Sequence, residues 1–113
     1  MSRTYIKFKS INREDEEQTI LRILKEKKYK KIESPVEEYY QHGLGILTSP
    51  QLIKYTFNND MIVIESWVRY FGFVGECSLN GSSQIFTKRS AKKTLKKIQE
   101  ELGLEIIEQG TIE

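Results

Sequence analysis

The sequence predicts an α+β fold, a two-layer sandwich in which an antiparallel sheet of about five strands carries helices on one face, in the order β-α-β-β-β-β-α. Three observations support this. Several segments alternate apolar and polar residues with the period of two that a half-buried strand requires. Two other segments repeat apolar residues at helical spacing. Clusters of Asn, Asp, Gly and Pro separate these segments, which indicates that each segment is a single strand or helix.

The first predicted elements are a strand over residues 4–9 and a helix after it. Ile6 and Phe8 share one face of the strand. Asn12 and Asp15 have the spacing of a capping box in which a short carboxylate replaces the usual Glu or Gln. The helix then fades in the lysine run at 27–31, before the Ser34-Pro35 break. Its apolar stripe is expected to contain Ile20, Leu21, Ile23 and Leu24.

The middle of the chain predicts a tyrosine-rich strand over 36–42 and then a hairpin that turns at Asn59-Asp60. With a two-residue turn the register separates apolar pairs from charged ones, whereas a three-residue loop would set Ile53 against Glu65 and mix the faces. We therefore expect the two-residue register. It pairs Phe57 with Ile62, Tyr55 with Ile64, Ile53 with Ser66, Lys54 with Glu65 and Leu52 with Trp67.

A second turn at Phe71-Gly72 is expected to fold residues 73–79 back as another strand, with Cys77 beside Ser66 and Glu76 opposite Trp67. A loop at 80–83 precedes the last helix, which Thr87 or Ser90 caps. Gly103 ends that helix, and residues 104–113 form either a short strand or an ordered arm. The apolar stripe of this helix consists of Ala91, Leu95, Ile98 and Leu102.

Length and composition predict one domain over residues 1–113. The apolar runs are too short to span a membrane, and the amino terminus lacks a secretory apolar region. The lone Cys77 fits a reducing cytoplasm and is expected to be an inert core thiol. His42 has no Cys or acidic cluster at metal-ligand spacing near it, so we expect neither a metal nor another cofactor.

Three stretches carry a resemblance to a known family: residues 72–81 (GFVGECSLNG), 47–54 (LTSPQLIK) and 91–97 (AKKTLKK). Over residues 47–102 the chain resembles a family of uncharacterised small bacterial domains. The resemblance implies a stand-alone accessory domain and no catalytic residues. The predicted order of elements also resembles the TATA-binding-protein-like arrangement, which concerns shape alone.

The last helix carries a candidate anion-binding surface. Its basic residues are expected to cover the face opposite the apolar stripe, and most such faces are only solvated. Here, however, cations crowd the amino-terminal turns, where the helix dipole disfavours them, which points to an anionic partner. Nucleic acid, acidic protein and anionic lipid headgroups stay open, although a net charge of +2 weakens the case for nucleic acid. The residues are Lys88, Arg89, Lys92, Lys93, Lys96 and Lys97.

The outer face of the hairpin is a second candidate, centred on Trp67 with charged neighbours. A tryptophan beside an arginine is typical of interface anchors. Either Trp67 is exposed, and this face binds a peptide, a small ligand or a second copy of the chain, or the tail or the loop at 43–49 covers it. The residues of this patch are Lys54, Glu65, Trp67, Arg69 and Glu76.

Three function classes follow. The favoured one is a non-enzymatic binding or accessory module, because no acid, base and nucleophile converge in the predicted fold. The alternative is a nucleic-acid-binding domain that uses the basic helix or the outer sheet face. An enzyme in which Glu65 and Glu76 do acid-base work around Trp67 has the least support.

Overall fold

The computed structural model describes residues 3–42, 50–69, 76–77 and 85–112, with only the backbone for 76–77 and 85–87. The described elements are seven strands and two helices. They are β1 (Arg3–Lys9), α1 (Arg13–Glu26), β2 (Lys30–Glu33), β3 (Glu38–His42), β4 (Gln51–Asn58), β5 (Met61–Arg69), β6 (Glu76–Cys77), α2 (Ile85–Leu102) and β7 (Ile106–Ile112).

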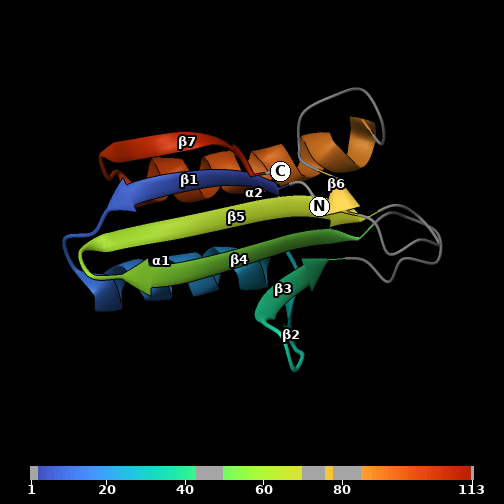
Figure 1. Cartoon of the computed structure of the whole chain (residues 1–113), viewed down its shortest axis with the longest axis horizontal. Coiled ribbons are helices and arrows are strands. Elements are labelled where there is room, and N and C mark those ends of the chain that lie inside the picture. The colour runs from blue at the N-terminus through green and yellow to red at the C-terminus, as the bar shows by residue number, and fades with distance from the viewer. Residues whose placement is uncertain (1–2, 43–49, 70–75, 78–84, 113) are drawn as a thin grey trace.

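The strands form one antiparallel sheet in the order β2-β3-β4-β5-β1-β7, and the short β6 pairs with β5 beyond the first residues of β1. Figure 1 shows both helices behind the strands, on the same face of the sheet. The main core lies between these two layers, with Phe8, Ile64 and Ile98 among its fully buried side chains. The predicted α+β two-layer sandwich is therefore confirmed. Within the described residues, no helix is long and apolar enough to cross a membrane.

The β4–β5 hairpin has the register that the sequence predicts, from Phe57 opposite Ile62 to Leu52 opposite Trp67. Asn59 at the turn has a φ of 57°, a left-handed conformation that asparagine tolerates better than most residues. The two-residue turn thus fixes which side chains of both strands face the helices.

The start of α1 shows a capping arrangement that differs in one partner from the prediction. The Asn12 side chain accepts from the Asp15 N–H at 3.2 Å, as expected. The reciprocal acceptor is Glu16, however, because its carboxylate receives the Asn12 N–H at 3.0 Å and the Ile11 N–H at 2.8 Å. Burial raises the pKa of Glu16, but hydrogen bonds from the Ser10 hydroxyl and these two N–H groups lower it overall.

Several predicted boundaries are wrong. The lysine run ends α1 but continues as β2, which pairs with β3 through a turn closed by Ser34 and Glu37. Leu21, predicted in the apolar stripe, is 39% exposed. The α2 helix begins at Ile85, so neither Thr87 nor Ser90 is its cap. Gly103 does end α2, with a φ of 60°, and the tail is a strand, β7.

The register of β6 is shifted by two residues from the prediction. Cys77 lies opposite Val68 rather than Ser66, and Glu76 lies opposite Arg69 rather than Trp67. A two-residue shift keeps the alternation of faces, so the periodicity used for the prediction could not detect it. The predicted turn at 71–72, the loop at 80–83 and the side chain of Cys77 lie outside the described residues.

Candidate ligand-binding groove

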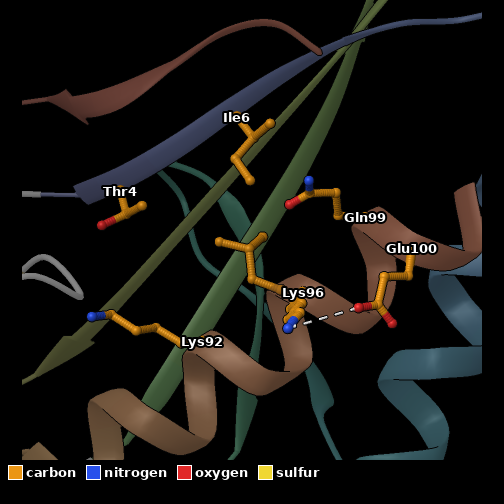
Figure 2. A pocket seen from close by; sticks show the side chains of 7 residues that line it. Thr4, Ile6, Lys92, Lys96, Gln99 and Glu100 are labelled. Carbon is orange, nitrogen blue, oxygen red and sulfur yellow. Dashed lines mark ion pairs between the residues drawn. The ribbon is translucent and has the colours of Figure 1, made fainter. Parts of the chain in front are cut away.

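A groove of about 360 Å³ lies between the first half of β1 and the middle of α2. Ile6 and Leu95 form its apolar floor, and polar side chains from both elements surround them. Figure 2 shows Ile6 directed from its strand toward the helix, while Lys92 and Lys96 extend from α2 around the opening. The lining residues are Thr4, Ile6, Lys92, Leu95, Lys96, Gln99 and Glu100.

A second hollow of about 270 Å³ continues this groove toward β7. It shares Thr4, Ile6 and Leu95 with the first and adds Gln109 and Gly110 from β7. Gly110 contributes only backbone here, because a Cβ at this position would point to the opposite face of the sheet, 3.3 Å from the Tyr5 hydroxyl oxygen. The groove therefore extends over two strands to the edge of the sheet.

The structure separates the six basic residues that the sequence grouped together. Lys88 is buried, with 3% of its surface exposed, because it lies three and seven residues before Ala91 and Leu95 and so shares their face. The prediction that it covers the opposite face is wrong. Lys97 turns toward α1, where its ammonium lies 3.0 Å from Glu26 and 3.9 Å from Glu101.

The remaining four cations are exposed, and two of them line the groove. Lys96 lies 4.0 Å from Glu100, a contact between two largely exposed side chains (Figure 2). Among the described residues, no carboxylate lies within 4.0 Å of Arg89, Lys92 or Lys93. The groove thus joins an apolar floor to a rim whose positive charge is incompletely neutralised.

The Trp67 face is arranged differently, because Trp67 is fully buried. The Arg3 guanidinium stacks on its ring at 3.7 Å from the centroid, and Tyr39 packs edge-on at 6.1 Å. The covering group therefore includes the first residue of β1, an element that the sequence analysis did not consider for this role.

An ion cluster fixes Arg3 in this position. Its guanidinium donates two hydrogen bonds to Glu37, at 2.6 and 3.1 Å, and lies 3.9 Å from Glu65. Lys54 donates to Glu37 at 2.9 Å. The hydrogen bond from Arg3, together with that from Lys54, outweighs desolvation and lowers the pKa of Glu37 to about 2. These contacts from Arg3 and Lys54 hold the Ser34–Glu37 turn against the sheet.

Four of the five residues predicted to bind on this face have contacts within the fold. Lys54 and Glu65 belong to the ion cluster, and Arg69 donates to the Tyr39 hydroxyl at 3.2 Å. Binding at this face was predicted only if Trp67 is exposed, and Trp67 is buried. The side chain of Glu76 lies outside the described residues.

A third hollow of about 330 Å³ lies between α1 and the β3–β4 strands. Its charged and hydroxyl groups contact one another: Tyr55 donates to Glu17 at 2.9 Å, and Lys31 lies 3.4 Å from Glu38. Burial, followed by the hydrogen bonds to Tyr40 and Glu17, raises the pKa of Tyr55. This hollow is polar, but these four side chains already pair with one another.

His42 packs against Tyr29, with ring centroids 5.5 Å apart. Within the described part of the chain, no group of three or more His, Cys, Asp and Glu side chains could hold a metal ion.

Sequence reasoning identified the lysines of the groove but not its other wall. Thr4 and Ile6 belong to a strand far from α2 in the chain, and Gln109 belongs to a tail whose structure was left open. Only the sheet order, with β1 between β5 and β7, brings them together. No family model, curated protein or solved structure matches this chain.

Proposed function

We propose that this chain is a non-enzymatic binding module of a bacterial cytoplasm, and that an anionic partner with an apolar part occupies the groove between α2 and β1. The observation that carries the proposal is Lys92, an exposed cation at the rim of a floor made by Ile6 and Leu95, which has no carboxylate partner in the part of the chain that the structure describes. The bacterial cytoplasm rests on the sequence resemblance and the lone Cys77.

The electrostatics of α2 support this proposal. Like charges that lie three or four residues apart on a helix repel one another and lower its stability. Arg89 lies three and four residues before Lys92 and Lys93, and none of the three has a carboxylate partner among the described residues. A bound anion would therefore relieve this repulsion. Lys96 is available as well, because an exposed lysine–glutamate pair contributes little and can exchange its partner.

The chemistry of the groove fits binding rather than reaction. Apolar surface, amide groups and ammonium groups together supply contact area, orientation and charge. Among the described residues that line it, the single carboxylate is Glu100, which already lies beside Lys96.

Fluorescence titration with an anilinonaphthalene sulfonate tests the proposal, because this probe combines an apolar body with one anionic group. We expect Lys92→Gln/Lys96→Gln to weaken probe binding about tenfold, since each exposed charge contact contributes somewhat less than 1 kcal/mol. The matched control is Arg89→Gln/Lys93→Gln, which removes two cations of the same helix that do not line the groove. Equal affinities of the two double variants would contradict the proposal.

Nucleic acid is the second candidate, favoured by three exposed cations that have no carboxylate partner among the described residues, Arg89, Lys92 and Lys93. Binding to phosphates releases counterions, so its affinity must fall steeply with salt. We expect weak or absent binding of random-sequence DNA and RNA at about 50 mM salt, and less at about 200 mM. Tight, salt-sensitive binding that the control variant weakens as much as the groove variant would favour this alternative.

A further inference from the structure

The two edges of the sheet differ in how they are protected. The β2 edge has four residues, three of them charged, and Lys31 lies 3.7 Å from Glu33 and 3.4 Å from Glu38. The β7 edge has seven residues with Glu108 as its only charge. Natural sheets protect their edges with short strands and charged side chains. Apart from Glu108 and one register irregularity near Ile106, β7 has no such protection among the described residues.

The backbone of β7 offers hydrogen-bonding groups at this edge. The Ser10 N–H donates to the Asp60 carbonyl, and this pair continues the β1–β5 register. The backbone N–H and C=O groups of the even-numbered residues of β1 therefore point to β5, and those of the odd-numbered residues point to β7. Lys9 confirms this, because its N–H donates to Glu105. Gly110, opposite Tyr5, therefore faces β1, and the N–H and C=O of Gln109 point away from it.

The same residue connects this edge to the groove. Gln109 pairs with Ile6 and lines the second hollow, so its side chain lies on the helix-covered face. Glu108 lies on the other face, where it accepts from Tyr5 and lies 3.7 Å from Lys7. Within the described residues, β7 thus supplies no acid to the face on which Lys92 and Lys96 lie.

We infer that β7 takes up an extended acidic peptide segment as an additional antiparallel strand, with its acidic side chains over the groove toward Lys92 and Lys96. This inference rests on the proposed function and names its partner class. Strand addition uses main-chain hydrogen bonds for affinity and alternate side chains for specificity, and both features meet at Gln109. A second copy of the chain would instead bring Gln109 and Thr111 to this face, without acids.

The first experiment uses the unaltered protein and a short fluorescent peptide that alternates Glu and Val. In an antiparallel added strand, residues whose side chains face the groove are those whose N–H groups point to β7. We therefore expect N-methylation of every Glu to abolish binding, while N-methylation of every Val leaves it largely intact. Equal effects of the two methylated peptides would overturn the inference.

The second experiment uses two substitutions of one residue. Gln109→Pro and Gln109→Ala both remove the side chain, but only proline removes the outward N–H, which an edge strand tolerates. We expect the proline variant to bind the peptide at least about tenfold more weakly than the alanine variant, the effect of losing one or two hydrogen bonds. The sulfonate probe should bind both variants equally, because it makes no strand contacts.

The two proposals fail in different ways. If sulfonate binding depends on Lys92 and Lys96 but the methylated peptides bind alike, the strand addition is wrong and the proposed function stands. If the peptides differ but neither ligand depends on these lysines, the proposed function and the acidic partner are both wrong. A dimer in sedimentation that only Gln109→Pro disrupts would make a second copy the occupant and overturn the inference.

Discussion

The two surfaces that the sequence singles out use their charges in opposite ways. On the Trp67 face, Arg3, Lys54, Glu37 and Glu65 contact one another and cover the tryptophan. At the α2 groove, Lys92 has no carboxylate partner among the described residues, and Lys96 has only an exposed one. The difference shows that residue types alone do not distinguish a binding surface from a stabilising cluster. The pairing and exposure of the side chains do.

The largest expected effect distinguishes the buried face of α2 from its exposed face. Leu95→Asp places a charge in the core stripe beside Ala91 and Ile98 and should cost about 4 kcal/mol or more, enough to unfold a domain of this size. Lys93→Glu changes only an exposed side chain and should leave the melting temperature nearly unchanged. Thermal melts of both variants measure this. Small and equal shifts would mean that α2 is wrongly oriented.

The next effect concerns the ion cluster on the Trp67 face. Glu37→Gln removes the carboxylate that accepts two hydrogen bonds from the buried Arg3 guanidinium, and should cost about 2 kcal/mol. Because folding lowers the pKa of Glu37 from 4.5 to about 2, its contribution is complete above pH 4.5 and is lost as the pH falls toward 2.

Urea unfolding of wild type and Glu37→Gln at pH 6, 4 and about 2.5 follows this contribution, and the gap in unfolding free energy should narrow as the pH falls. Taking the difference between the two proteins removes the effect of other carboxylates. A gap that stays constant over this range would show that the Glu37 carboxylate does not hold Arg3 in place.

The smallest effect concerns Lys97, which the structure places outside both the groove and the Trp67 face. Lys97 joins α2 to Glu26 of α1 through an exposed ion pair. Lys97→Gln should lower the melting temperature by about 1–2 °C, because exposed pairs contribute little. The shift should shrink at about 1 M salt, where the Debye length is only about 3 Å. A larger shift that is insensitive to salt would indicate packing rather than charge.

Periodicity and turn chemistry predict the fold class, the β4–β5 register and the end of α2 at Gly103, because these depend on neighbouring residues. They do not predict long-range partners. Burial of Trp67 depends on Arg3, more than sixty residues away in the chain, and on Glu37 in a turn. Lys88 was predicted on the exposed face because lysine is charged, but its spacing from Ala91 and Leu95 puts it on their buried face.

The groove shows the same limit. Its lysines stand in the sequence, but its opposite wall comes from β1 and β7, and no local pattern shows that these strands are neighbours. Strand order in a sheet is a property of the whole chain.

One paired measurement tests the contrast between the two surfaces most directly: the melting temperature and the affinity for the sulfonate probe, determined for Lys92→Gln/Lys96→Gln and for Glu37→Gln/Lys54→Gln at neutral pH. We expect the groove variant to keep its melting temperature and to lose about tenfold in affinity. The Trp67-face variant should lose several degrees in melting temperature and keep its affinity, because its charges stabilise the fold. If the groove variant melts lower and binds normally, or the Trp67-face variant binds weakly at full stability, the roles assigned to the two surfaces are wrong.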